Sequence, residues 1–159
     1  MSPAHRPGPD GRPPQELPVE TCLTCHLVVN QEAATPLSVH LGYDPAEPFG
    51  VSVSFPSDEN RRTRWVFSRD LLQDGLYEPT GEGDVRVWPS GGCRCGCCGS
   101  THARILLQGA TGYALLDLPL EPVQHWLDRT WSLVPEGTEE SRLDWSVVEH
   151  LVGQEPPSA

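Results

Sequence analysis

The chain has 159 residues, a length that suits one domain with a core large enough to fold without disulfides or metals. Its 22 acidic side chains against 11 basic ones give a net charge of -11, which argues against bulk attraction to nucleic acid or anionic membranes. No run approaches the ~18 apolar residues of a membrane span, and the N-terminus lacks the apolar core of a signal peptide, so we expect a cytoplasmic protein.

The first segment, residues 1–18, contains six prolines and two glycines. Such a composition cannot build a core, and it predicts an extended, mobile tail. We expect the folded domain to span residues 19–153 and residues 154–159 to form a disordered C-terminus.

Strand patterns then follow one another along the chain. Phe49, Val51, Val53 and Phe55 alternate strictly with small polar residues, which is typical of a strand with one buried face. Trp65 and Phe67 alternate in the same way before Ser68. In all, about seven strands are predicted, near residues 23–29, 37–43, 49–55, 64–68, 84–88, 103–107 and 113–118.

A short helix is predicted between two of these strands. Ser68 is placed to accept a hydrogen bond as its N-cap, and Leu71 and Leu72 supply its apolar side. Gly75 fits the left-handed stop position, with Leu76 able to fold back on Leu71.

Two longer helices are predicted towards the C-terminus. Apolar residues from Val123 to Val134 recur at spacings of three and four, and Pro135 ends the pattern. Its tryptophans, Trp126 and Trp131, are interpreted as a ridge that packs on a sheet, with a partner-binding stripe as the alternative. Ser141 and Asp144 match a capping box for a second helix that ends near Gly153.

The order of these elements predicts an α+β fold, with one short helix and two longer C-terminal helices. The stretch WVFSRDLLQDGLYEPTGEGDVRVWPS at residues 65–90 resembles the central block of the SsgA-like (SALP) sporulation and cell division proteins. The stretch LGYDPAEPFGVSVSF at residues 41–55 is similar to the strand pair that precedes this block in the family.

The resemblance implies a Whirly-like architecture with two antiparallel β-layers, assembled as a trimer. It also implies a non-enzymatic adaptor of septation and spore-wall maturation, at division septa. Its expected partners are the tubulin-like FtsZ, directly or indirectly, and other SsgA-like proteins. In the block itself the apolar residues are explained as core, which leaves the polar residues, taken as exposed, as candidates for a partner surface. These are Arg69, Asp70, Asp74, Glu78 and Arg86.

The cysteines suggest a zinc site, because two CxxC pairs can supply four thiolates. Cys22 and Cys25 form one pair, and a second lies in the loop GGCRCGCCGSTH. If the first pair lies in a regular strand, its side chains point to opposite faces and cannot share a metal. A site within the loop avoids this objection. Its ligands would be three of Cys93, Cys95, Cys97 and Cys98, with His102.

Two other readings of the cysteine loop stay open, a disulfide and a reduced hairpin tip rich in small residues. The loop departs from the family pattern, in which this hairpin is variable and polar, so the resemblance gives it no role. A metal-responsive or redox-responsive adaptor is therefore one alternative function.

The other alternative is a Whirly-type single-stranded nucleic-acid-binding protein, for which Arg61, Arg62 and Arg64 are the candidate contacts. On an otherwise acidic protein, such arginines more often form a solvated turn that offsets nearby carboxylates. No catalytic motif is found: a nucleophile elbow, a P-loop and a dinucleotide glycine pattern are all missing from the sequence.

Overall fold

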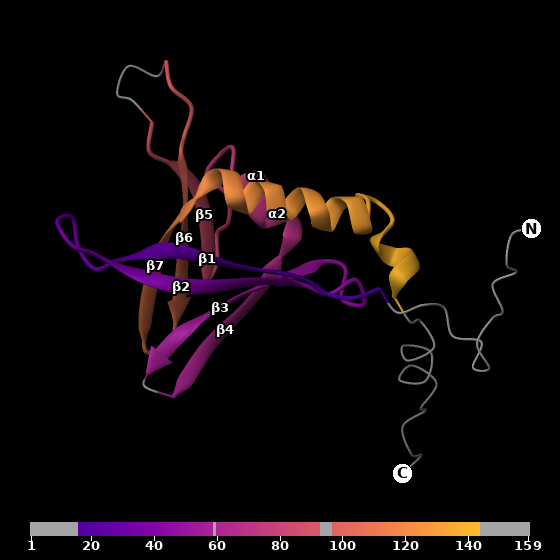
Figure 1. The fold of residues 1–159 in the computed structure, drawn as a ribbon, viewed down its shortest axis with the longest axis horizontal. Coiled ribbons are helices and arrows are strands. Elements are labelled where there is room, and N and C mark those ends of the chain that lie inside the picture. The colour runs from indigo at the N-terminus through magenta and orange to yellow at the C-terminus, as the bar shows by residue number, and fades with distance from the viewer. Residues whose placement is uncertain (1–15, 59, 93–96, 144–159) are drawn as a thin grey trace, which may run out of the picture.

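The structure, a computed structural model, describes residues 16–58, 60–92 and 97–143. Over these residues the chain forms one seven-stranded antiparallel sheet with the order β4-β3-β2-β1-β7-β6-β5 (Figure 1). The strands are β1 (Val19–Val28), β2 (Ala34–Tyr43), β3 (Gly50–Asp58), β4 (Arg61–Ser68), β5 (Val85–Ser90), β6 (His102–Gly109) and β7 (Gly112–Pro119). The helices are α1 (Arg69–Gly75), α2 (Leu120–Leu133) and the 3-10 helix η1 (Glu139–Arg142).

The sheet is curled, so that β5, β6 and β7 cross the direction of β1 and β2 in Figure 1. β1 pairs with β2 along its whole length and joins β7 through His26 opposite Asp117 and Leu27 opposite Leu116. β1 therefore connects the N-terminal β1–β4 meander to the C-terminal strands. This arrangement is one continuous sheet, whereas the sequence analysis expected two β-layers.

One face of the sheet carries the core. Along β3, Val51, Val53 and Phe55 are buried, and Trp65 and Phe67 of β4 pack partly buried against them, as the period-two alternation predicted. Figure 1 shows α2 running beside β1, with α1 next to it. From α2 the buried Trp126 donates from Nε1 to the carbonyl oxygen of Val19, 3.1 Å away. Trp126 therefore packs on the sheet, as predicted.

α1 begins as predicted, because the backbone amide of Leu71 donates to Ser68 Oγ. The prediction for Gly75 was wrong. Gly75 lies inside the helix without a left-handed backbone, and a Cβ placed there would lie 2.3 Å from Val87 Cβ. A glycine is needed here because α1 approaches β5 closely.

α2 begins two residues before Pro122 and ends at Leu133, ahead of Pro135. Ser141, expected to cap a further helix, lies within η1. The predicted helix itself, from Asp144 to Gly153, falls outside the described residues, as do the tail residues 1–15.

Candidate functional site

Arg69, the first residue of α1, was expected to be exposed, and that expectation was wrong. Its side chain is buried, with 1% of the residue's surface exposed. α1 carries Arg69 on the side that faces the C-terminal end of α2, where helical carbonyl groups lack intrahelical partners. A buried guanidinium needs acceptors, and this position supplies them to both terminal nitrogens, whereas Nε has no hydrogen-bond partner among the described residues.

The guanidinium of Arg69 joins three segments of the chain. Nη1 donates to the carbonyl oxygens of Thr130, 3.1 Å away, and Val134, 3.0 Å away, at the end of α2. Nη2 donates to Glu139 Oε1 of η1 at 2.9 Å, which makes a buried ion pair. α2 has no basic residue in its own last turn, so Arg69 supplies the positive charge that the helix C-terminus favours.

Two aromatic rings enclose the same guanidinium. Its Cζ lies 3.4 Å from the centroid of the Trp131 ring and 4.7 Å from that of Tyr43. The indole Nε1 of Trp131 also donates to Gln73 Oε1 at 2.9 Å, which links α2 to α1 a second time. Cation–π contacts with a desolvated arginine are among the stronger interactions of this kind, so the helix pair is held firmly.

The carboxyl of Glu139 has a pKa below its ordinary value of 4.5. Its own backbone amide is the main cause, and the hydrogen bond from Arg69 adds to it, whereas burial acts in the opposite direction. The contact is therefore an ion pair over the whole neutral range.

An open hollow of about 620 Å³ lies between the exposed sides of α1 and the C-terminal end of α2. We call it the acidic groove. Four carboxylates line it together with the half-buried ring of Trp131. The lining residues are Asp70, Gln73, Asp74, Asp128, Trp131, Pro135 and Glu136.

The acidic groove brings together two of the predicted partner residues, Asp70 and Asp74, one helical turn apart on α1. Glu78 and Arg86 are exposed but do not line it. Sequence reasoning missed the half that α2 and the following turn contribute, above all Asp128 and Glu136. The spacing of Trp131 from Asp128, also close to one helical turn, was the available signal.

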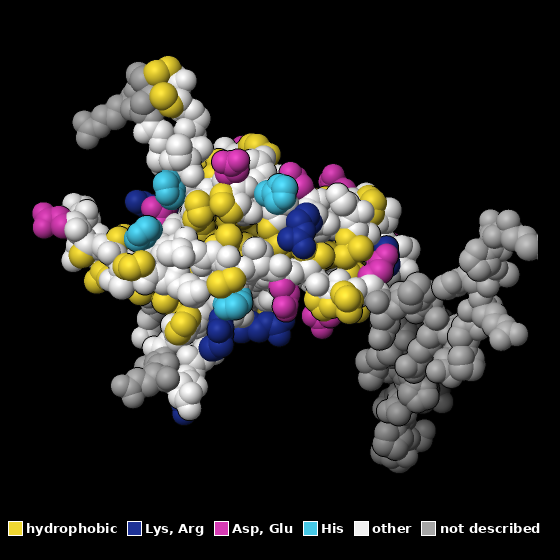
Figure 2. All heavy atoms as spheres, in the orientation of Figure 1, with side chains coloured by type: hydrophobic (Ala, Val, Ile, Leu, Met, Phe, Trp, Pro, Cys, Tyr) yellow, Lys and Arg dark blue, Asp and Glu magenta, His cyan; other side chains and the backbone are white. Residues whose placement is uncertain are grey.

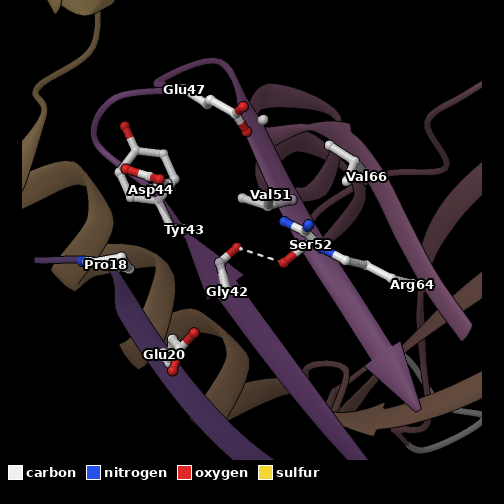
Figure 3. Close-up of a pocket in the computed structure, with 11 residues that line it drawn as sticks. Pro18, Glu20, Gly42, Tyr43, Asp44, Glu47, Val51, Ser52, Arg64 and Val66 are labelled. Atoms are coloured by element: carbon white, nitrogen blue, oxygen red, sulfur yellow. Dashed lines mark hydrogen bonds between the residues drawn. The ribbon is translucent and has the colours of Figure 1, made fainter. Parts of the chain in front are cut away.

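Arg62 and Arg64 alternate with the core-packed Trp65 and Phe67, so they lie on the face of β4 away from the core, whereas Arg61, the first residue of the strand, has the opposite parity. Arg61, Arg62 and Arg64 are exposed, and Figure 2 shows dark blue side chains gathered on the lower side of the molecule, where β3 and β4 run. In Figure 3, Arg64 borders a small hollow of about 150 Å³ beside Ser52 and Val66. The aromatic residues of β4, Trp65 and Phe67, pack towards the core instead.

The structure separates the two cysteines of the first CxxC. Both lie within the regular strand β1, where Cys22 is exposed and Cys25 has no exposed surface. Burial, with a smaller contribution from the charge of Asp117, raises the pKa of the Cys25 thiol to about 11. The prediction of a zinc site that joins the two CxxC pairs was therefore wrong, because Cys22 and Cys25 point to opposite faces of the sheet.

Only some of the ligands predicted for the zinc site within the loop lie in the described residues. Cys93 and Cys95 fall outside the described residues, whereas Cys97 is disulfide-bonded, which agrees with the disulfide alternative. His102 begins β6, with its Nδ1 2.9 Å from Thr101 Oγ1. Within residues 16–58, 60–92 and 97–143, no three His, Cys, Asp or Glu side chains are grouped as metal ligands. The same residues contain no helix that is long and apolar enough to cross a membrane.

Fold and site together define an α+β protein with one curled antiparallel sheet, an arginine-locked helix pair and an open acidic groove beside it. The chain belongs to the SsgA family, because the sequence model of the family described as "Streptomyces sporulation and cell division protein, SsgA" matches residues 37–139. The members it resembles are sporulation and cell division proteins.

The relatives cover most of the chain. It is 39% identical to the sporulation-specific cell division protein SsgB of Streptomyces coelicolor over 79% of this chain and 91% of that protein. It is 33% identical to SsgB of Thermobifida fusca, over 82% of this chain and 96% of that one.

Two solved structures have the same fold. A structure from work on SsgB mutations and longitudinal cell division in Streptomyces coelicolor superposes with a TM-score of 0.73, at 39% identity, over 80% of this chain and 97% of that one. The crystal structure of an SsgA-like sporulation-specific cell division protein from Thermobifida fusca superposes with a TM-score of 0.74, at 29% identity, over 87% of this chain and 99% of that one.

Proposed function

We propose that this protein is a non-enzymatic adaptor of sporulation-specific cell division, which docks a basic segment of a division protein in the acidic groove. The observation that carries the proposal is the groove itself, in which four carboxylates surround one aromatic ring. Its membership of a family of sporulation and cell division proteins supports a role in cell division, and the groove on its described surface is suited to a partner.

The chemistry of the groove favours lysine or arginine side chains. Carboxylates on both sides can each accept charge-assisted hydrogen bonds from a basic side chain. Trp131 can contact the apolar stem of the same side chain, because long basic residues bury their methylenes while the charge stays near water. The Arg69 contact holds that ring in place, so the partner meets a preformed surface.

The partners that this proposal names are the FtsZ-based division machinery, directly or indirectly, and other SsgA-like proteins. We further propose that the protein acts at division septa as a homo-oligomer, with a trimer as the specific expectation. Light scattering of the purified protein tests the trimer independently of the groove.

The adaptor proposal is tested with a fluorescent fusion in a sporulating host. Four neutralising substitutions, Asp70→Asn, Asp74→Asn, Asp128→Asn and Glu136→Gln, remove the charge of the groove. A matched control changes four exposed acids outside it, Glu32→Gln, Glu82→Gln, Asp84→Asn and Glu121→Gln.

We expect the wild type and the control to form ladders at sporulation septa and the groove variant to be diffuse, because steric fit without charge binds a basic segment weakly. A groove variant that forms normal ladders would exclude the acidic groove as the docking site. A wild-type protein that is diffuse during septation would exclude the septal role.

The structure offers less support for the nucleic-acid alternative. Sequence-tolerant binding of single strands uses aromatic rings that stack on bases beside basic residues. Arg62 and Arg64 lie on the face of β4 opposite to Trp65 and Phe67, and those two rings pack against the core, so arginines and aromatic rings do not form one such surface. Absence of binding to a labelled oligonucleotide at low salt would end this alternative.

A further inference from the structure

Cys22 lies beside an imidazole and a hydroxyl on the outer face of the sheet, away from the acidic groove. Its Sγ is 3.7 Å from His40 Nε2 and 3.2 Å from Ser38 Oγ. All three residues are exposed. Cys22 and His40 are directly opposite in the β1–β2 ladder, which pairs ten residues on each strand and so fixes their relative position.

The two thiols of this CxxC have opposite environments. Cys25 has no exposed surface and its thiol pKa is raised to about 11, so a reagent in water cannot reach it as a thiolate. Cys22 is open to solvent and has a base within hydrogen-bond reach. Because residues three apart in a strand stand ~10 Å from one another and point to opposite faces, the pair cannot close on itself as a disulfide.

We propose that Cys22 is a reactive thiol, that His40 acts as its base, and that it forms a mixed disulfide with a low-molecular-weight disulfide. A neutral imidazole that carries its proton on Nδ1 presents a lone pair on Nε2 towards the sulfur. A nucleophile and a base within hydrogen-bond reach are the minimum for an activated thiol. Ser38 Oγ can donate to the sulfur as its negative charge develops.

The exchange balances without a further reactant. His40 Nε2 accepts the proton of Cys22, and the sulfur attacks one sulfur of the small disulfide. The S–S bond of the reagent breaks while the new S–S bond forms, so that Cys22 is oxidised and the leaving sulfur is reduced. The departing thiolate takes the proton from the imidazolium and leaves as a thiol.

Oxidised glutathione at neutral pH tests this on the full-length, reduced protein. The rate of modification is followed by acid quenching and fragmentation mass spectrometry, which assigns each adduct to one cysteine. The variants are His40→Ala and His40→Gln, with Cys22→Ser to confirm the assignment. His26→Ala is the matched control, because His26 is an exposed histidine of β1 that makes no bond to Cys22.

We expect an adduct on Cys22 and none on Cys25 in the wild type. Both His40 variants should react at Cys22 about three- to tenfold more slowly, less than the full effect of an enclosed general base because the pair is exposed to water. His26→Ala should react like the wild type. An unchanged Cys22 rate in the folded His40→Gln variant, or an adduct on Cys25 at the same rate, would overturn the proposal.

Discussion

Arg69 shows how one residue can connect elements that are far apart in the sequence. Its guanidinium satisfies two carbonyl groups at the end of α2 and the carboxylate of Glu139, about 70 residues away. Arg142 completes the same helix end, since its Nη2 donates to the carbonyl oxygen of Leu133 at 3.2 Å and its Nη1 contacts Glu16. Two arginines from other segments therefore replace the basic residue that α2 lacks in its last turn.

Replacing Arg69 with alanine should lower the free energy of unfolding by about 3–5 kcal/mol, because the buried carboxylate of Glu139 loses its positive partner and the carbonyl of Val134 loses a donor. Denaturant unfolding measures this loss. Arg129→Ala, an exposed arginine on the same helix α2, is the control and should change stability by less than about 1 kcal/mol.

A second comparison separates the ion pair from the packing. The double variant Arg69→Met with Glu139→Leu should be more stable than Arg69→Ala, because it leaves no charge unpaired. If Arg69→Ala is as stable as Arg129→Ala, the guanidinium contacts do not stabilise the helix pair.

The pH dependence of the same contact follows from Glu139, whose pKa is lower in the folded protein than its ordinary value of 4.5. A carboxyl with a depressed folded pKa stabilises the protein fully above its unfolded pKa, and this stabilisation is lost as the pH falls through the folded pKa. Glu139→Gln removes the titration. We therefore expect the stability difference between wild type and Glu139→Gln to be constant near neutral pH and to shrink below pH 4.5. A difference that grows on acidification would contradict this assignment.

At the scale of elements, the contact of α1 with β5 depends on the missing side chain of Gly75. Alanine favours helices over glycine by about 1 kcal/mol, so propensity alone predicts a stabilised Gly75→Ala variant. A Cβ at this position would lie 2.3 Å from Val87 Cβ, and overpacking of this kind costs about 1–3 kcal/mol or more. We expect net destabilisation in thermal unfolding.

The control for this prediction is Gly83→Ala, because a Cβ at Gly83 would meet no atom within 4 Å. Val87→Gly provides a further check, since it removes both Val87 Cβ and Cγ1, the two atoms closest to the added Cβ. The penalty of Gly75→Ala should be smaller in a Val87→Gly background. Equal penalties in both backgrounds would show that close approach to Val87 is not the reason for the glycine.

These elements also show what the sequence could predict. Local signals sufficed for the alternating strands, for the Ser68 cap and for the amphipathic period of α2. The burial of Arg69 was missed because its acceptors lie on α2 and η1, and no local pattern reports a contact of that separation. The acidic groove was half predicted for the same reason, since Asp70 and Asp74 share one helix whereas Asp128 and Glu136 come from a distant segment.

For the whole molecule, the feature that makes one sheet out of two chain segments is the pairing of β1 with β7. We call this pairing, of His26 with Asp117 and of Leu27 with Leu116, the β1–β7 seam. The β2–β4 strands lie on one side of β1, and β5–β7 lie on the other. Leu116 is fully buried at the seam, directly opposite Leu27. If the seam couples both sides, the molecule unfolds as a single cooperative unit, as most domains of this size do.

Leu116→Ala tests this coupling, and Leu115→Ala is its control, because Leu115 is only partly buried and points to the other face of β7. We expect Leu116→Ala to cost about 2–5 kcal/mol and Leu115→Ala less, since the first leaves a cavity in the core. Native-state hydrogen exchange is the measurement. The most protected amides of β2 and of β6 should lose the same free energy of opening in Leu116→Ala, because both exchange through the same global unfolding. If β6 loses protection while β2 keeps it, the two sides of β1 are separate cooperative units and the seam joins them only in the folded state.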